Sequence, residues 1–307
     1  MRYDVIIIGS GPAGLSAAIY GMRARLQTLV IEKQPMSGGQ ILNTSEVDNY
    51  PGLPGIGGFE IGQKFREHAD KMGAEFVTAE VLKIEDDKTY KKVITDKETY
   101  ETRTVIFATG ANHRKLEVPG EEELSGMGVS YCATCDGAFF RNRTVAVVGG
   151  GDVALEDALF LARTCEKVYL IHRRDAFRGA KVLCEAVEKQ ENIEIIWDTV
   201  VERINGTDQV ESLSVFNKKK DERTTLAVSG VFIAVGIVPN TKEAEGVVEL
   251  DAGGYIVAGE DTVSSVPGIY AAGDVRTKNL RQVITAASDG ANAITSVENY
   301  LNTEGRN

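Results

Sequence analysis

Two glycine-rich turns constrain the fold of this chain more than any other feature. They are Gly9–Gly14, which reads Gly-Ser-Gly-Pro-Ala-Gly, and Gly149–Ala154, which reads Gly-Gly-Gly-Asp-Val-Ala. Each follows a short apolar run and precedes a stretch whose apolar residues have helical spacing. In such a turn the glycines let the backbone approach a pyrophosphate, and the helix N-terminus favours its charge. The sequence therefore predicts two dinucleotide-binding units.

The segments around the two turns repeat one order of strand, helix and strand. The expected elements are Val5–Ile8, Ala13–Arg25 and Thr28–Ile31 in the first unit, and Thr144–Val148, Val153–Arg163 and Lys167–Ile171 in the second. Parallel strands joined through a helix require right-handed crossovers and a sheet that helices cover. The sequence therefore predicts an α/β fold with an internal duplication.

Two charge-rich stretches of alternating polarity, Val81–Arg103 and Leu213–Val228, are expected to form antiparallel strands. The charge run Lys218–Arg223 is expected to be a hairpin tip. Each unit then closes on an apolar strand that ends in a small-residue turn, at Val105–Gly110 and at Val231–Gly236. The duplication thus extends beyond the two turns.

The segments that follow these closing strands are rich in turn residues. Pro119-Gly120 and Pro239-Asn240 suit connectors between domains. The remaining piece, Gly246–Asn307, is too short for a third domain. We expect it to pack on the first unit.

Composition excludes several classes of protein. A chain of 307 residues has room for two domains, and 43% hydrophobic with 26% charged residues is typical of a soluble globular protein. No stretch approaches the roughly 18 apolar residues of a membrane helix. A net charge of −11 argues against a nucleic-acid or anionic-membrane partner. Because the first residues run directly into a strand pattern, we expect no signal peptide and a cytoplasmic protein.

The residues after the second strand of each unit differ in charge. Glu32 ends this strand in the first unit, where a carboxylate can accept hydrogen bonds from ribose hydroxyls. At the same offset the second unit has His172-Arg173-Arg174-Asp175, with Arg178 close behind. Guanidinium groups suit a ribose 2′-phosphate, so the second site favours NADPH. The alternative is that the arginines only solvate a loop, and His172 is expected to shape that loop.

A Cys-x-x-Cys motif, Cys132-Ala133-Thr134-Cys135-Asp136, lies between the two turns. It has three explanations: a redox pair, half of a zinc site, or chance. The rest of the chain offers no second ligand pair at metal spacing, so no metal is expected. Redox chemistry needs an attacking thiolate, a leaving thiolate and a nearby acid, which Asp136 supplies if it faces the same cavity. Cys165 and Cys184 lie apart and are expected to be buried small side chains.

These motifs, with Gly38-Gly39-Gln40 and Ala272-Gly273-Asp274, resemble those of the bacterial low-molecular-weight thioredoxin reductases over essentially the whole chain. The resemblance implies two Rossmann-like dinucleotide-binding domains, the second inserted in the first. Each would have three layers, two of β-sheet and one of α-helices (ββα). Residues 1–113 and 244–307 would form the FAD-binding domain, and residues 114–243 the NADPH-binding domain with the redox-active disulfide. It also implies a homodimer.

The resemblance further implies the role of individual residues. Hydride would pass from NADPH to FAD, and the reduced flavin would open the Cys132–Cys135 disulfide. Cys135 would lie against the flavin, Cys132 would attack the disulfide of thioredoxin, and Asp136 would be the general acid. The implied FAD contacts are Gly9, Ser10, Gly11, Pro12, Ala13, Gly14, Glu32, Lys33, Gly39, Gln40, Thr44, Val47, Asn49, Gly273, Asp274, Arg281, Gln282 and Val283. The implied NADPH contacts are Gly149, Gly151, Asp152, Ala154, His172, Arg173, Arg174 and Arg178.

The dithiol lies in the expected NADPH-binding domain. The flavin therefore cannot face both the nicotinamide and the disulfide in one arrangement of the domains. The resemblance implies a large domain rotation, with hinges expected near His113–Leu116 and Pro239–Glu243. One position departs from the family, since Val153 stands where members often carry Ser or Thr. Other activities remain open: reduction of a peroxiredoxin or glutaredoxin-like partner, a flavin-dependent dithiol oxidase, a ferredoxin–NADP reductase, or a non-catalytic redox sensor.

Overall fold

The computed structural model describes residues 2–44, 47, 49–87 and 90–304. Met1 and residues 305–307, at the ends of the expected first domain, and residues 88–89, in the expected stretch Val81–Arg103, lie outside the described residues. The chain forms two compact units. The first unit comprises Met1–Asn43, Tyr50–Asn112 and Val238–Asn307, and the second comprises Thr44–Asn49 and His113–Ile237.

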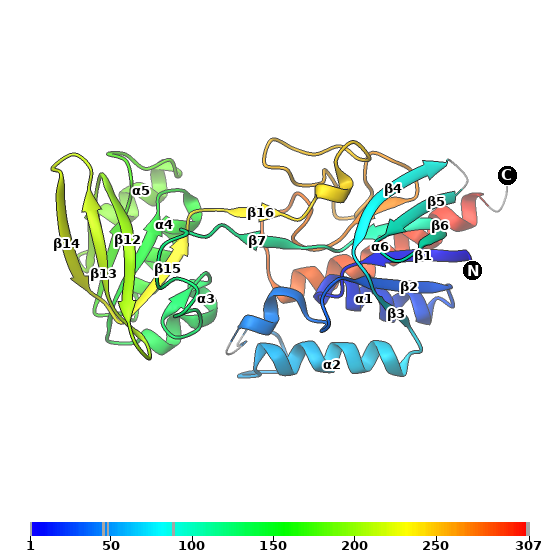
Figure 1. Ribbon diagram of the computed structural model, residues 1–307, viewed down its shortest axis with the longest axis horizontal. Helices are drawn as coiled ribbons and strands as arrows, with labels where there is room; N and C mark the ends of the chain where they lie inside the picture. The colour runs from blue at the N-terminus through cyan, green and yellow to red at the C-terminus, as the bar shows by residue number, and fades with distance from the viewer. Residues whose placement is uncertain (1, 45–46, 48, 88–89, 305–307) are drawn as a thin grey trace. The chain divides into compact units, whose positions relative to one another are not determined.

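The first unit contains a parallel sheet built from strands distant in the sequence (Figure 1). Its order is β3-β2-β1-β6, and β17 also pairs with β6. The strands are β1 (Arg2–Ile8), β2 (Thr28–Glu32), β3 (Glu75–Thr78), β6 (Thr99–Phe107) and β17 (Ile269–Ala271). Ile8 lies opposite both Ile31 and Phe107, and Ala271 lies opposite Phe107. The ends of four strands therefore meet beside the first glycine-rich turn.

Two different layers cover this sheet. On one face Val5, Ile7 and Val30 pack in one cluster with residues of α1 (Pro12–Arg23), α2 (Gly58–Lys71) and α6 (Val283–Glu304). On the other face Ile6 and Ile8 pack with residues of β4 (Val81–Asp87) and β5 (Tyr90–Thr95). The β4-β5-β6 pairs are antiparallel, as the alternating pattern of Val81–Arg103 predicts. The first unit thus has three layers, two of β-strands and one of α-helices (ββα), as expected.

The second unit repeats this plan with its own core. Its parallel sheet has the order β11-β10-β9-β15-β8. The strands are β8 (Val129–Ser130), β9 (Thr144–Gly149), β10 (Lys167–Ile171), β11 (Ile193–Ile196) and β15 (Gly230–Ala234). Val145 and Val147 face α4 (Asp152–Ala162) and α5 (Lys181–Glu188), whereas Ala146 and Val148 face the antiparallel sheet of β12 (Thr199–Gly206), β13 (Val210–Asn217) and β14 (Glu222–Ala227). Burial of each large aliphatic side chain contributes about 1.5–3 kcal/mol to folding.

Local polar contacts explain several of the shorter features. The side chain of Asn217 accepts hydrogen bonds from the N–H groups of Lys219 and Lys220, which closes the β13–β14 hairpin at the predicted charged tip. The short helices are η1 (Gly39–Asn43), α3 (Ala133–Asp136), η2 (Gly137–Phe140) and η3 (Lys242–Ala244). No helix in the described part of the chain is long and apolar enough to cross a membrane.

The segments that link the two units pair with each other. They are β7 (Ala111–His113) and β16 (Ile237–Pro239), which form a two-stranded sheet. The prediction that Pro119-Gly120 is a connector is wrong, because this turn lies inside the second unit. Its Pro119 carbonyl accepts a hydrogen bond from Ile204 N at 2.9 Å. The turn residues therefore allow this segment to pack closely against β12.

The C-terminal piece packs on the first unit, as the sequence predicts. Strand β17 pairs with β6, and α6 packs along α1. Ser16 Oγ donates to the Ala287 carbonyl at 2.6 Å, and a Cβ at Gly290 would overlap the backbone of Ala13. The start of α6 is therefore held beside the first turn.

Candidate redox centre and dinucleotide sites

The first glycine-rich turn admits no side chain at two of its positions. Gly9 has a φ of +99°, and a Cβ there would lie 2.5 Å from the Ala108 carbonyl oxygen. A Cβ at Gly14 would overlap the Gly9 carbonyl, so this glycine allows close packing of helix on strand. At Gly11, in contrast, only the Gly38 carbonyl lies within 4 Å of a Cβ position. The backbone is thus closely packed at Gly9 and Gly14. It is open at Gly11, as the approach of a pyrophosphate requires.

Glu32 is tied to this turn. Its Oε2 accepts hydrogen bonds from both the backbone N–H and the Oγ of Ser10, each at 2.8 Å, and its Oε1 accepts the Gln34 N–H at 2.9 Å. Ser10 is fully buried and Glu32 is half-buried, whereas the neighbouring Lys33 is exposed. Glu32, the residue predicted to bind a ribose, therefore also holds the first turn in place.

The Ala272-Gly273-Asp274 motif lies against the same turn. Gly273 has a φ of +83°, and a Cβ there would lie 2.9 Å from the Ala13 side chain. Two buried polar atoms next to it, Asp274 Oδ1 and Arg281 Nε, have no hydrogen-bond partner among the described residues. Burial raises the pKa of Asp274, although Lys278 and Arg281 act in the opposite direction. Such buried polar groups fit the polar atoms of a bound FAD.

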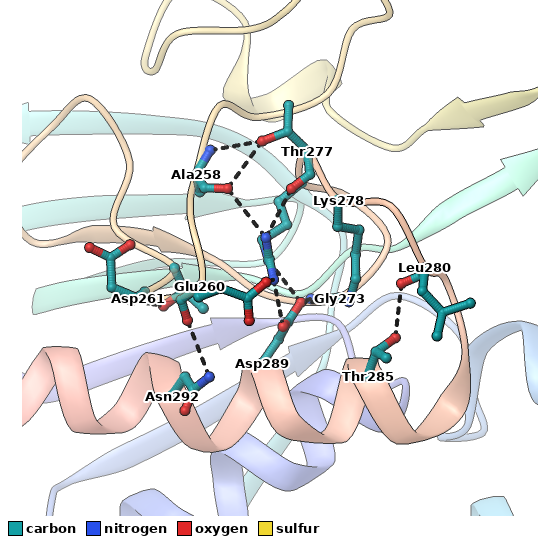
Figure 2. A network of polar contacts seen from close by, with 12 residues as sticks. Ala258, Glu260, Asp261, Gly273, Thr277, Lys278, Leu280, Thr285, Asp289 and Asn292 are labelled. Carbon is teal, nitrogen blue, oxygen red and sulfur yellow. Dashed lines mark hydrogen bonds and ion pairs between the residues drawn. The ribbon is translucent and has the colours of Figure 1, made fainter.

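A buried ion cluster holds the Asp274 segment in place, and sequence reasoning missed it (Figure 2). Asp289 on α6 accepts hydrogen bonds from Arg276 Nε and Nη2, each at 2.8 Å, from Lys278 Nζ at 2.9 Å and from Gly273 N at 2.8 Å. Burial alone would raise the pKa of Asp289, but the bonds from Arg276 and Lys278 outweigh it and hold this pKa below its ordinary value. The cluster fixes the loop that carries Asp274.

The structure places the remaining predicted FAD contacts in different surroundings. Gly39 and Gln40 begin η1 and are exposed, while Gln282 and Val283 are half-buried at the start of α6. Thr44, Val47 and Asn49 belong to the segment Thr44–Asn49, which groups with the second unit. Their contact with a flavin stays a prediction.

The second turn is supported by a histidine ring. A Cβ at Gly150 would overlap the ring of His172, which is buried and whose Nε2 lies 3.1 Å from the Ala176 carbonyl oxygen. Burial is the main cause that lowers the pKa of His172, with Arg178 and Arg174 acting in the same direction. A neutral imidazole therefore packs beneath the turn, which agrees with its expected role in shaping the loop.

The arginines after this turn are available for a ligand. Arg173, Arg174 and Arg178 are exposed, and in the described part of the chain none of the three pairs with a carboxylate. The Arg178 N–H donates to the Gly150 carbonyl at 2.8 Å, which ties the arginine loop to the turn. A Cβ at Gly151 would meet nothing within 4 Å, so the turn is open at the N-terminus of α4. These residues fit the pyrophosphate and 2′-phosphate of NADPH.

Three further residues of this turn lie at the start of α4. Asp152 Oδ1 accepts the Ala180 N–H at 2.6 Å, which anchors the far end of the arginine loop. Val153 is 55% exposed, so an apolar side chain lies at the surface there. Ala154 is fully buried beneath the turn.

Cys132 and Cys135 form a disulfide at the start of α3, with their Cα atoms 5.3 Å apart. The Cys132 carbonyl accepts hydrogen bonds from Cys135 N and Asp136 N, which begins the helix around the pair. Thr134 Oγ1 lies 3.4 Å from Cys132 Sγ, and because a disulfide sulfur has no proton, the hydroxyl is the donor. Asp136 accepts a 2.6 Å hydrogen bond from Ser130, so its carboxylate is fixed beside the pair. The other two cysteines are free; Cys165 is buried as expected, and Cys184 is only half-buried.

The residue before the disulfide is linked to the end of β7. The Tyr131 ring stacks on His113 with centroids 5.2 Å apart, and its hydroxyl donates to Glu121 Oε1 at 2.7 Å. Glu121 is buried and also accepts the N–H groups of Leu116 and Glu117. Burial raises the pKa of Tyr131 and lowers that of His113, so both rings are neutral. The sequence contained no signal for this cluster, because its members are separated by up to 18 positions.

Asp157, which differs from the residues common at this position in the family, is a second carboxylate near the disulfide segment. On α4 it shares a face with Phe160 and Leu161, whose side chains lie against Gly137 just after Asp136. Burial, with a smaller contribution from Glu156, raises the pKa of Asp157 to about 7. The group therefore changes its charge near neutral pH.

The fold and the sites define a class of proteins with two dinucleotide-binding domains and a redox-active disulfide. A sequence profile of the pyridine nucleotide-disulphide oxidoreductase family matches residues 3–290, and the chain belongs to that family. It is similar to the thioredoxin reductase of Listeria innocua serovar 6a, with 47% identity over 97% of this chain and 94% of that protein. It is also similar to the thioredoxin reductase of Bacillus subtilis strain 168, with 43% identity over 97% and 95% of the two chains. A crystal structure of thioredoxin reductase from Streptococcus pyogenes MGAS5005 superimposes with a TM-score of 0.92, at 45% identity and with 98% and 99% coverage.

Proposed function

We propose that this chain is a thioredoxin reductase that uses NADPH and FAD. The observation that carries the proposal is the Cys132–Cys135 disulfide, which lies in the same unit as the arginine-marked dinucleotide turn. The curated relatives of similar length support thioredoxin as the electron acceptor. When bound, FAD would supply the conversion of hydride chemistry into reduction of a disulfide.

Apart from Thr44, Val47 and Asn49, the residues that would hold each cofactor lie in one unit. For FAD, the open backbone at Gly11, the fixed carboxylate of Glu32 and the unpaired Asp274 Oδ1 supply the turn, the ribose acceptor and a buried acceptor. For NADPH, the open backbone at Gly151 and the exposed guanidinium groups of Arg173 and Arg174 supply the pyrophosphate turn and the 2′-phosphate contacts. The assignment of residues 1–113 and 244–307 to FAD, and of residues 114–243 to NADPH, is part of this proposal.

The chain's own residues would carry out the exchange with thioredoxin. Cys132 is half-buried, and the Thr134 hydroxyl donates a hydrogen bond to its sulfur, which stabilises a thiolate there. The Cys132 thiolate would attack the thioredoxin disulfide, Asp136 would protonate the departing sulfur, and Cys135 would then resolve the mixed disulfide. We further propose that the protein is a cytoplasmic homodimer, which light scattering of the purified protein would test.

Thioredoxin-dependent oxidation of NADPH tests the proposal. We expect the purified flavoprotein to oxidise NADPH when oxidised thioredoxin is added, and Cys132→Ser to abolish this turnover because the attacking sulfur is gone. Cys184→Ser is the matched control, since Cys184 is a free cysteine of the same unit outside the disulfide segment, and this variant should keep full activity.

Three outcomes would select other functions. Turnover only with a peroxiredoxin or a glutaredoxin-like protein would favour another disulfide partner. Rapid consumption of oxygen on addition of a free dithiol would favour a dithiol oxidase. Reduction of the flavin by NADPH without any reduction of the Cys132–Cys135 disulfide would contradict the proposal.

A further inference from the structure

Ser130 lies between the disulfide and the carboxylate beside it. It ends β8, and only 5% of it is exposed. Its Oγ donates to Asp136 Oδ2 at 2.6 Å and accepts the Cys132 N–H at 3.1 Å. A hydroxyl has one proton, so the 2.6 Å bond takes it in preference to the 3.3 Å contact with the Cys132 carbonyl. One buried side chain thus joins the backbone of Cys132 to the carboxylate of Asp136.

We infer that Ser130 is a positioning residue that holds Asp136 for proton transfer in thiol–disulfide exchange at Cys132. The inference rests on the proposed function of this disulfide and adds a residue to it. Asp136 is the last residue of α3, a helix of only four residues. Ser130 is held by the sheet, because β8 pairs with β15 and places Ser130 opposite Phe232. A 2.6 Å hydrogen bond from this strand to the carboxyl group of Asp136 favours one side-chain rotamer.

The proton must move at a defined point of the exchange. The Cys132 thiolate attacks one sulfur of the partner disulfide, so a new S–S bond forms and the partner's S–S bond breaks. The electron pair of the broken bond leaves with the second partner sulfur, which takes the proton of the Asp136 carboxyl group. Cys135 then gives its proton to Asp136 and attacks Cys132 Sγ, which re-forms the Cys132–Cys135 bond and releases the first partner sulfur as a thiolate. Two electrons pass from the dithiol to the partner, and Asp136 returns to its initial state.

Two small disulfides separate a positioning role from a structural one. Hydroxyethyl disulfide releases an alkyl thiolate, which is strongly basic and leaves faster when it is protonated. Dithiobis(nitrobenzoate) releases an aromatic thiolate of low basicity, which leaves without a proton. A residue that only stabilises the fold should affect both reactions equally, whereas a residue that positions the acid should affect the alkyl disulfide selectively.

The experiment uses the full flavoprotein, reduced with dithiothreitol and freed of excess reductant, in rapid mixing with each disulfide. We expect Ser130→Ala to slow exchange with hydroxyethyl disulfide about tenfold, and exchange with dithiobis(nitrobenzoate) less than about twofold. In the Asp136→Asn background, Ser130→Ala should cause no further loss, because the acid it positions is absent. Ser130→Thr keeps the hydroxyl and should retain the wild-type ratio of the two rates.

The matched control is Ser214→Ala, which removes a hydroxyl of the second unit that accepts a 3.0 Å hydrogen bond from Asn205. It should change neither rate. Equal slowing of both disulfides by Ser130→Ala, or an undiminished effect in the Asp136→Asn background, would overturn the inference. Neither reaction needs NADPH or thioredoxin. Wild-type protein that exchanges with both disulfides but fails to turn over thioredoxin would therefore refute the proposed function and leave the test of Ser130 intact.

Discussion

The two dinucleotide turns share one backbone plan and are held by different residues. In the first, Ser10 is fully buried and both of its donors bind Glu32. In the second, the equivalent position is Gly150, and the ring of His172 occupies the space where a side chain would lie. The same strand–turn–helix geometry is thus stabilised by a charged hydrogen bond in one unit and by neutral packing in the other.

This difference sets the charge that each turn offers to a ligand. Glu32 brings a carboxylate to the first turn, which suits free ribose hydroxyls and repels a 2′-phosphate. The second turn has no acid at that offset, and its arginines stay exposed and unpaired with carboxylates among the described residues. The two turns of this duplicated scaffold therefore offer a ligand different charges.

The last residue of each glycine-rich motif, Gly14 in the first and Ala154 in the second, gives the largest expected effect on stability. Gly14→Ala would place a Cβ against the Gly9 carbonyl, and we expect it to lower the free energy of unfolding by about 3 kcal/mol. The reciprocal change, Ala154→Gly, removes a buried methyl group from α4 and should cost about 1 kcal/mol. Urea denaturation and the flavin content of the purified proteins measure both effects.

A bound flavin should be lost only from the Gly14→Ala variant, because only that substitution displaces the first turn. Equal destabilisation by the two changes would show that the turns do not differ in how closely helix and strand approach.

The arginine pair tests the charge difference. We expect Arg173→Ala combined with Arg174→Ala to raise the KM for NADPH about hundredfold, because two charge-assisted contacts to the 2′-phosphate are lost. The KM for NADH, which lacks this phosphate, should change less than about twofold. Arg163→Ala with Arg203→Ala is the control, since it removes the same charge from exposed positions outside the turn. An equal rise in KM for both nucleotides would refute the assignment of these arginines.

A half-buried position in the helix after the second turn gives the smallest expected effect. Where α1 has the buried Ala17, α4 has Asp157, whose pKa is raised to about 7 chiefly by burial. The folded pKa lies above the value of about 3.9 in the unfolded chain. The stability that Asp157 contributes is therefore present below about pH 4 and is lost as the pH rises through 7. Asp157→Asn should raise the free energy of unfolding by about 2 kcal/mol at pH 8, after allowance for partial exposure, and hardly at all at pH 4.

Glu156→Gln is the control for this pH dependence. It removes the smaller cause of the shift and keeps the larger one, so it should lower the pKa of Asp157 slightly and stabilise the protein less than Asp157→Asn does. A gain of equal size at pH 4 and pH 8 in Asp157→Asn would show that ionisation is not the cause.

Much of this comparison could be predicted from the sequence, because the signals are local. The apolar runs and turns predicted both βαβ units, the antiparallel stretches and the packing of the C-terminal piece on the first unit. The prediction of Pro119-Gly120 as a connector failed because turn residues also serve close packing within a unit. The sequence also predicted the difference in charge between the two sites. Glu32 and the arginines both follow the second strand of their unit, at the same offset from its glycine-rich turn.

Residues that act through long-range contacts could not be predicted. Asp289 holds the Asp274 loop from a helix 15 positions further on, and Glu121 reaches Tyr131 from a turn. Neither has a motif, because its function depends on which elements the fold brings together. Ser130 lies two residues before Cys132, yet only the structure shows its hydroxyl bonded to Asp136.

The most direct test of the account is the fate of the disulfide when NADPH alone is added. The flavoprotein is mixed anaerobically with NADPH, without thioredoxin, and its thiols are alkylated and mapped by mass spectrometry. We expect Cys132 and Cys135 to become alkylated only after NADPH is added, and oxidised thioredoxin to restore the disulfide. A flavin that is reduced by NADPH while both cysteines stay protected from alkylation would contradict this expectation.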